Sequence, residues 1–124
     1  MILGIGIDII EIERIKKSVE QYGDNFLNRI FTKTELEYSL NKKNKFQHLA
    51  ARFAAKEAIT KAISSHHKSF GWKDIEIVNL VNGMPTVNLL GKLKDFLGND
   101  KIIHISMSHS DHYVTCVAIL SLKT

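Results

Sequence analysis

The sequence is nearly free of cysteine, because Cys116 is its single one. One cysteine forms neither an internal disulfide nor a Cys-x-x-Cys metal site, which excludes a disulfide-stabilised domain and a thiolate zinc centre. Cys116 lies in an apolar run, where a buried free thiol is the expected state. This cysteine usage favours a reducing compartment inside the cell, and we predict a cytoplasmic location.

Long apolar runs are also missing. No stretch approaches the roughly 18 apolar residues of a membrane-spanning helix, and the first residues, Met1 to Gly6, lack a basic leader and are interrupted by glycines. We find no repeats, low-complexity tracts or linkers, and 124 residues fit one domain of ordinary size. We therefore predict a soluble protein without a membrane partner, folded as a single domain over residues 1–124.

Aromatic residues make up only 8% of the chain, whereas the formal charge is +4 and the pI is near 9.2. A basic chain favours acidic partners, such as nucleic acid, a membrane surface, a phosphorylated cofactor or an acidic protein. The cations are dispersed and no aromatic stacking motif is visible, which disfavours a nucleic-acid-binding module. We predict no nucleic-acid partner and keep that module, and a non-catalytic oligomeric scaffold, as competing hypotheses.

The segment 50–64 has the periodicity of an amphipathic helix. Its alanine-rich face offers little apolar area, which predicts a helix packed closely against other backbone. The opposite face carries three cations and one carboxylate, and such a surface could hold an anion beside a metal. The apolar face consists of Ala51, Ala54, Ala55, Ala58, Ile59, Ala62 and Ile63, and the polar face of Arg52, Phe53, Lys56, Glu57, Thr60 and Lys61.

The segment Ile2 to Ile10 alternates like a strand, and its isoleucine-rich side predicts a buried one. Gly4, Gly6 and Asp8 share the other side. Glycines within a strand indicate that something approaches the backbone closely. Asp8 with Glu11 also fits a helix-capping pair, which is the simpler explanation of that carboxylate.

The remaining segments complete an α+β pattern. Helical spacing covers Ile12 to Tyr22, and Thr32 with Glu35 predicts a capping box that opens a short helix ending at Leu40. His66 and His67 are expected on the surface of a polar loop. The predicted order is a strand, three helices, a β-hairpin turning at Asn82-Gly83, a helix over 90–97, and a second β-hairpin over 103–120.

Two carboxylates stand out chemically, because Asp8 and Glu57 lie in constrained settings near several cations. Hard carboxylates beside Arg52, Lys56 and Lys61 suit Mg²⁺ that is bound partly by protein and partly by substrate phosphates. Spacing alone favours a simpler interpretation, in which Glu57 and Lys61 form a surface pair worth about 0.2–0.5 kcal/mol. The polar alternation over 104–110 fits either a site or a solvent-exposed sheet face.

Three segments together resemble the 4'-phosphopantetheinyl transferase family in their order and separation, over essentially the whole chain. They are Gly4-Ile5-Gly6-Ile7-Asp8-Ile9 with Arg14-Ile15, then Arg52-Phe53-Ala54-Ala55-Lys56-Glu57-Ala58 through Lys61-Ala62, and His104-Ile105-Ser106-Met107-Ser108-His109-Ser110. The resemblance implies the fold of that family. It also implies transfer of the 4'-phosphopantetheine arm of coenzyme A to a serine of apo acyl carrier protein for fatty acid synthesis. Mg²⁺, release of adenosine 3',5'-bisphosphate and a homotrimer with sites between protomers follow from the same resemblance.

The resemblance assigns roles by position. Asp8 and Glu57 would be catalytic metal ligands, and Lys61 would stabilise the transferred phosphoryl group. The general base stays open between Asp8, Glu57, a metal-held water and a histidine. Met84 stands in the turn where the family commonly has lysine. Coenzyme A contacts are expected from Arg52, Lys61, His104, Ser106, Asn82, Gly83 and Pro85, contacts to its 3'-phosphate from Lys42 and Lys43, and carrier-protein docking from Arg14, Arg29, Phe26 and Phe53.

Overall fold

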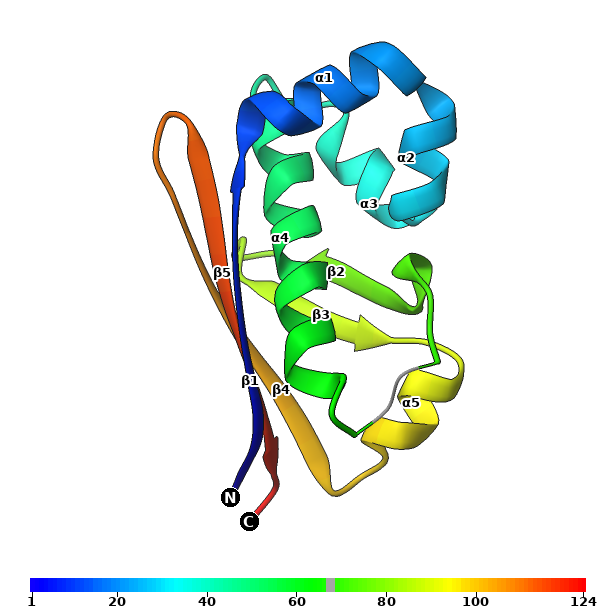
Figure 1. Cartoon of the computed structure of the whole chain (residues 1–124), viewed down its shortest axis with the longest axis vertical. Helices are drawn as coiled ribbons and strands as arrows, with labels where there is room; N and C mark the ends of the chain where they lie inside the picture. The colour runs from blue at the N-terminus through cyan, green and yellow to red at the C-terminus, as the bar shows by residue number, and fades with distance from the viewer. Residues whose placement is uncertain (67–68) are drawn as a thin grey trace.

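A computed structural model describes residues 1–66 and 69–124, so the prediction for His67 lies outside the described residues, whereas His66 is exposed as expected. The chain is an α+β domain in which one long central helix lies between a three-stranded sheet and a layer of shorter elements (Figure 1). In chain order the elements are β1 (Ile2–Glu11), α1 (Ile12–Tyr22), α2 (Asp24–Ile30), α3 (Lys33–Ser39), α4 (Lys45–Ile63), the short 3₁₀ helix η1 (Trp72–Asp74), β2 (Ile75–Asn79), β3 (Pro85–Leu89), α5 (Lys92–Leu97), β4 (Lys101–His109) and β5 (Tyr113–Leu122).

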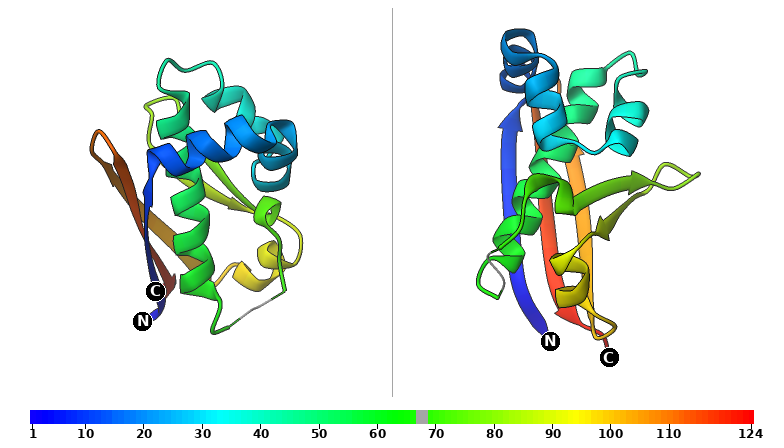
Figure 2. Two further views of the ribbon diagram at one scale, coloured as in Figure 1. Left: turned by 45° about the horizontal axis from the view of Figure 1, so that its top comes forward. Right: turned by 90° about the vertical axis from the view of Figure 1, so that its right-hand side faces the viewer.

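The larger sheet is antiparallel, in the order β1-β5-β4. The first strand therefore pairs with the last, and β5 occupies the centre. Cys116 in β5 pairs with Asp8 on one side and Met107 on the other, and it is fully buried as predicted. Strands β2 and β3 form a separate hairpin that projects sideways from the body of the domain (Figure 2). Both hairpins agree with the sequence prediction.

The helical layer differs from the prediction in two respects. The apolar group at Phe26–Phe31 belongs to an additional short helix, α2, and α4 begins at Lys45 rather than at residue 50. The capping box of α3 is confirmed, because the Glu35 amide donates to the Thr32 hydroxyl and the Thr32 amide donates to the Glu35 carboxylate. The capping role considered for Asp8 is wrong: α1 starts at Ile12, and Asp8 lies in the interior of β1.

Helix α4 packs against β1 through backbone rather than bulk, as its alanine-rich face predicts. A Cβ on Gly6 would lie 1.9 Å from the Ala58 carbonyl oxygen, and one on Gly4 would lie 2.0 Å from that of Ala62. Both distances are far inside van der Waals contact, so only glycine permits this approach. Close packing brings Asp8, on the same face of β1 as the two glycines, next to the polar side of α4.

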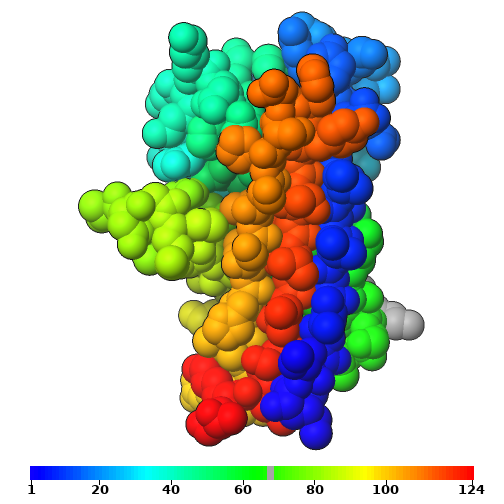
Figure 3. Space-filling model, turned by 90° about the vertical axis from the view of Figure 1, so that its left-hand side faces the viewer, coloured from blue at the N-terminus to red at the C-terminus, as the bar shows by residue number. Residues whose placement is uncertain are grey.

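The other face of β1 is open, which corrects the expectation of a strand buried on its isoleucine side. Ile5, Ile7 and Ile9 are 61%, 63% and 66% exposed. Ile5 and Ile7 pair with Ile119 and Val117 of β5. Figure 3 views this outer face of the sheet. The buried core lies on the inner face instead, where β5 presents Val114, Cys116, Ala118 and Leu120 toward α4. Within the described residues, no helix is long and apolar enough to cross a membrane.

Candidate active site

Asp8, Glu57 and Lys61, here called the carboxylate cluster, meet where β1 packs against α4. Asp8 and Glu57 line one small hollow. The Lys61 ammonium lies 3.5 Å from Asp8 Oδ1 and donates to the Ile7 carbonyl oxygen at 2.9 Å. Lys61 keeps half of its side chain exposed. The structure thus brings together the three residues for which a joint catalytic role was expected.

The carboxylate cluster has more negative than positive charge. Burial raises the pKa of Glu57, and the neighbouring Asp8 carboxylate raises it further, whereas Lys61 acts in the opposite direction. One ammonium shared with a backbone carbonyl does not neutralise two carboxylates. An additional cation at this position would relieve their repulsion.

The ligand set available to such a cation is small. Among residues 1–66 and 69–124, no three His, Cys, Asp or Glu side chains gather closely enough to hold a metal ion together. Two carboxylates are the complement expected for Mg²⁺, which commonly keeps several waters and takes further oxygens from substrate phosphates. The observed pair therefore fits a magnesium site that the substrate completes.

The hollow that Asp8 and Glu57 line has a volume of about 310 Å³. It is also lined by three of the four residues predicted to dock a carrier protein. Arg14 from α1, Phe26 from α2 and Phe53 from α4 line it together with Asp8 and Glu57. The Phe53 ring stacks on Trp72 at 5.1 Å between centroids. Arg29 does not line this hollow; it is exposed in the last turn of α2.

A larger pocket of about 880 Å³, here called the hairpin pocket, lies between α4, the β2–β3 hairpin and β4. Its lining includes the predicted residues Arg52, Gly83, Pro85, His104 and Ser106. The described lining residues do not include Asn82, Lys42 or Lys43, although the Lys42 ammonium lies 4.5 Å from the centre of the Tyr38 ring, which does line the pocket. Sequence reasoning missed Tyr38, His48 and Asn79.

Arg52 is the buried cation of the hairpin pocket, with only 2% of its surface exposed. It donates to the His48 carbonyl oxygen at 3.1 Å and to the Asn79 side-chain oxygen, and its guanidinium carbon lies 4.5 Å from the Tyr38 ring centre. No carboxylate pairs with it within the part of the chain that the structure describes. Burial lowers its pKa, but a guanidinium stays protonated, so the pocket contains a fixed positive charge.

His48 contributes a neutral ring to the same pocket. Burial lowers its pKa, and the nearby cations Arg52 and Lys42 lower it further. The ring packs edge-to-face on Tyr38 at 5.7 Å. Aromatic surfaces next to a fixed cation form a pocket suited to a planar, anionic ligand such as a nucleotide.

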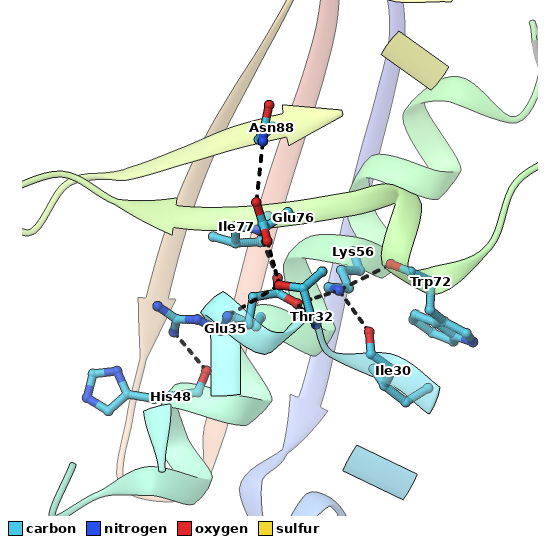
Figure 4. A network of polar contacts seen from close by, with 10 residues as sticks. Ile30, Thr32, Glu35, His48, Lys56, Trp72, Glu76, Ile77 and Asn88 are labelled. Carbon is cyan, nitrogen blue, oxygen red and sulfur yellow. Dashed lines mark hydrogen bonds and ion pairs between the residues drawn. The ribbon is translucent and has the colours of Figure 1, made fainter. Parts of the chain in front are cut away.

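Lys56 does not belong to either site, which corrects its predicted place on the exposed polar face of α4. Its side chain is fully buried, and its ammonium lies 2.6 Å from Glu35 Oε1 (Figure 4). It also donates to the carbonyl oxygens of Ile30 and Trp72 at 2.8 and 3.1 Å. These contacts use all three of its donors, so Lys56 has no free N–H for a phosphate. The fully buried Cys116 thiol is also unsuited to chemistry, because burial raises its pKa to about 11.

The carboxylate cluster and the hairpin pocket lie at opposite edges of the larger sheet. The cluster belongs to the edge strand β1 and the pocket to the edge strand β4, with β5 between them. The space-filling view shows β1 and the hairpin on opposite sides of the outer sheet surface (Figure 3). The chain thus presents the two predicted parts of the site separately.

Comparisons with known proteins agree on one family. Residues 4–118 match the model of the 4'-phosphopantetheinyl transferase superfamily. A holo-[acyl-carrier-protein] synthase of Protochlamydia amoebophila is 48% identical over 98% of this chain and 99% of the relative. The crystal structure of the Neisseria meningitidis synthase is 30% identical and superposes with a TM-score of 0.88 over 98% of this chain and 99% of that one. The Helicobacter pylori synthase, solved in complex with coenzyme A, is 30% identical with a TM-score of 0.82 over 94% of this chain and 99% of that one.

Proposed function

The chain belongs to the 4'-phosphopantetheinyl transferase superfamily, and we propose from this membership that it catalyses the holo-[acyl-carrier-protein] synthase reaction. It transfers the 4'-phosphopantetheine arm of coenzyme A to a serine of apo acyl carrier protein and releases adenosine 3',5'-bisphosphate. The observation that carries this proposal is the full-length similarity to synthases, including one solved with coenzyme A. The carboxylate cluster offers residues suited to the pyrophosphate of coenzyme A, and the hairpin pocket offers residues suited to its nucleotide.

We propose that Asp8 and Glu57 hold a Mg²⁺ ion. Burial, and then the neighbouring Asp8 carboxylate, raise the pKa of Glu57, and this supports the assignment because a bound cation would favour the charged form of both carboxylates. The ion, when bound, acts as a Lewis acid on the pyrophosphate and neutralises its developing charge. Lys61, half exposed beside Asp8, is placed to reach a phosphoryl oxygen.

The proposed reaction is an in-line substitution at phosphorus. The serine hydroxyl oxygen forms a bond to the phosphorus that carries the pantetheine arm, and the bond from that phosphorus to the pyrophosphate bridging oxygen breaks. The serine proton passes to a base, for which Asp8, Glu57, a metal-held water and a histidine are the candidates, and adenosine 3',5'-bisphosphate leaves. Such reactions depend mainly on positioning and charge neutralisation. Lys61 would supply charge at the reacting group, whereas Arg52 and His104 would hold the nucleotide.

We propose a homotrimer in which the site forms between protomers. Two parts of one site at opposite sheet edges can meet when the β1 edge of one protomer faces the β4 edge of the next, which is a head-to-tail contact that closes into a ring. The exposed isoleucines of β1 support this proposal, because a flat apolar sheet face of this kind is typical of an interface. Light scattering of the purified protein tests the oligomeric state.

Carrier-protein docking is proposed at Arg14, Arg29, Phe26 and Phe53. An acidic carrier would meet the two arginines, while the two rings border the carboxylate cluster where its serine must arrive. We also propose a cytoplasmic location, which the unpaired, fully buried thiol of Cys116 supports.

The direct test incubates the protein with coenzyme A, Mg²⁺ and an apo acyl carrier protein and follows the mass of the carrier. The expected result is a mass gain equal to one phosphopantetheine arm. Asp8→Ala and Glu57→Ala should abolish turnover while leaving far-UV circular dichroism unchanged. No mass gain with several carriers would refute the reaction, and an active double variant would refute the metal assignment.

A further inference from the structure

Asn79 bridges the two structural parts of the hairpin pocket. It is the last residue of β2 and pairs with Pro85 of β3. Its side-chain oxygen accepts from the Arg52 guanidinium, and its side-chain nitrogen donates to the Gly83 carbonyl oxygen at 3.0 Å. One amide thereby joins the buried cation of α4 to the backbone of the hairpin turn.

The orientation of this amide is fixed by its two neighbours. A guanidinium has only donors and a backbone carbonyl has only an acceptor, so the oxygen must face Arg52 and the nitrogen must face Gly83. Gly83 itself adopts a φ of +88°, a conformation that side chains rarely tolerate. The turn is thus held by its own backbone geometry and by Asn79.

Arg52 needs such a partner because it is a buried charge that forms no ion pair among the described residues, with Glu35 acting on it only at longer range. Its Nε is buried and has no hydrogen-bond partner in the described part of the chain. Unpaired buried charge is costly. Asn79 satisfies one donor of the guanidinium without cancelling its charge, so Arg52 stays attractive to an anion in the pocket.

We propose that Asn79 is a positioning residue for coenzyme A: it fixes the Arg52 guanidinium and the Gly83 turn in one arrangement and, being neutral, leaves the cation free to bind a phosphate group. This inference rests on the proposed function, since it takes coenzyme A as the occupant of the hairpin pocket. It predicts that the identity of residue 79 sets nucleotide affinity rather than the rate of phosphoryl transfer. The carboxylate cluster, which would carry out the transfer, lies at the other edge of the sheet.

Two substitutions at this position separate tethering from charge. Asn79→Ala removes both hydrogen bonds: one donor of the Arg52 guanidinium loses its partner, and the charge of Arg52 is unchanged. Asn79→Asp keeps an acceptor for Arg52 but neutralises the guanidinium and places an acceptor against the Gly83 carbonyl. If residue 79 were merely structural, the aspartate, which retains the arginine contact, would be the milder change in every measurement. If it positions a cation for an anion, the aspartate should be the more damaging change for binding.

The experiment uses the purified full chain in the assembly that it forms in solution. Calorimetry measures its affinity for adenosine 3',5'-bisphosphate, and steady-state kinetics give KM for coenzyme A and kcat. We expect Kd and KM to rise about tenfold for Asn79→Ala, which loses a hydrogen bond to a charged group, and about fiftyfold for Asn79→Asp, which compensates the positive charge that attracts the phosphate. The value of kcat should change by less than about threefold. The unfolding midpoint of Asn79→Asp should equal or exceed that of Asn79→Ala.

Asn88 gives a matched control in the same hairpin. It is exposed on β3, donates to Glu76 at 3.3 Å, and is not one of the described lining residues of the pocket. Asn88→Ala and Asn88→Asp should leave Kd and KM within about twofold of wild type.

Three outcomes decide the inference. Wild-type affinity in both Asn79 variants overturns it while the proposed function stands. Affinity that falls in parallel with thermal stability, with alanine the more damaging change, also overturns it in favour of a purely structural role. A wild-type protein that neither binds coenzyme A nor modifies a carrier overturns the proposed function, and the inference with it.

Discussion

Lys56 and Lys61 stand little more than one turn apart on α4, and each pairs with a carboxylate, yet they do opposite things. The Lys56–Glu35 pair is fully buried, with 2.6 Å between Nζ and Oε1, and every donor of Lys56 is used. The Lys61–Asp8 pair is longer, at 3.5 Å, and the lysine is 52% exposed. A satisfied network holds elements together, whereas a loosely satisfied one stays available to a ligand.

The buried pair connects five elements, one of which is η1 through the Trp72 carbonyl oxygen. Glu35 also accepts from the Ile77 amide at 2.8 Å, so the pair ties α3 and α4 to β2. The carbonyl of Ile30 adds the end of α2. Through Thr32, whose hydroxyl donates to Glu76 at 2.6 Å, the network reaches the hairpin a second time (Figure 4). Lys56 and Glu35 thus fix the position of the hairpin that forms one wall of the pocket.

The largest effect is expected from Lys56→Met, which tests whether the buried lysine is structural. It leaves Glu35 buried without its counter-charge, which costs about 3–5 kcal/mol of unfolding free energy. Urea denaturation measures the loss. Adding Glu35→Gln to Lys56→Met should recover part of it, because the uncompensated charge is then gone. A single variant as stable as wild type would contradict the structural role.

The next largest effect should be on turnover, from Lys61→Met. Loss of the charge that we propose to stabilise the transferred group is expected to lower kcat about 10²- to 10³-fold, whereas the half-exposed pair contributes less than about 1 kcal/mol to folding. Carrier-modification kinetics and thermal unfolding on the same samples separate the two. Lys61→Arg should retain more activity than Lys61→Met. Reduced stability with unchanged kcat would place Lys61 with Lys56 rather than with the site.

A smaller effect, of opposite sign, is expected from Glu57→Gln in metal-free buffer. The folded state holds the pKa of Glu57 above its ordinary value, so between those two values the folded chain binds more protons than the unfolded one, and stability falls as pH rises through that window. Removing the charge should raise the unfolding midpoint near pH 7. The gain should shrink as pH falls toward about 4.3, the pKa of an exposed glutamate.

Glu37→Gln is the control for this measurement, because Glu37 is exposed on α3. Its midpoint should follow wild type at both pH values. A metal-free Glu57→Gln protein that is less stable than wild type near pH 7 would show that Glu57 stabilises the fold rather than straining it.

The smallest effect is expected for an exposed ion pair, which sets the lower limit of the comparison. Lys33 and Glu37 form an exposed pair one turn apart on α3, at 4.0 Å, with 91% and 67% of their side chains exposed. Lys33→Ala should change the free energy of unfolding by less than about 0.5 kcal/mol, as is usual for such pairs. The same urea titration measures it. A loss comparable to that of Lys56→Met would mean that burial does not distinguish the pairs.

Local sequence patterns were sufficient for some of these features. Gly4 and Gly6 in one segment, and the alanine face of α4 in another, predicted close backbone packing. Each pattern of small side chains could be recognised within its own segment. The capping box of α3 was predictable for the same reason. The helix α2 was not predicted, because its seven residues are too short to show a clear period.

The role of Lys56 could not be read from the sequence. Helical periodicity places it on the polar half of α4, and only the packing of α2, α3 and the hairpin over that half buries it. Glu35, read as a capping residue, serves Lys56 as well. Asn79 was missed for a related reason: its meaning depends on Arg52, which is distant in sequence and meets it only across the pocket.

Cys116 can report when the central strand β5 separates from its neighbouring strands. As the only thiol in the chain, buried between Asp8 and Met107 with a pKa near 11, it should resist alkylating reagents while the sheet is closed. The rate of alkylation under native conditions would then measure how often β5 separates from its neighbours. Because β5 joins the edge strand that carries the carboxylate cluster to the edge strand that borders the hairpin pocket, a ligand that stabilises the pairing of these strands should slow the labelling without contacting the sulfur.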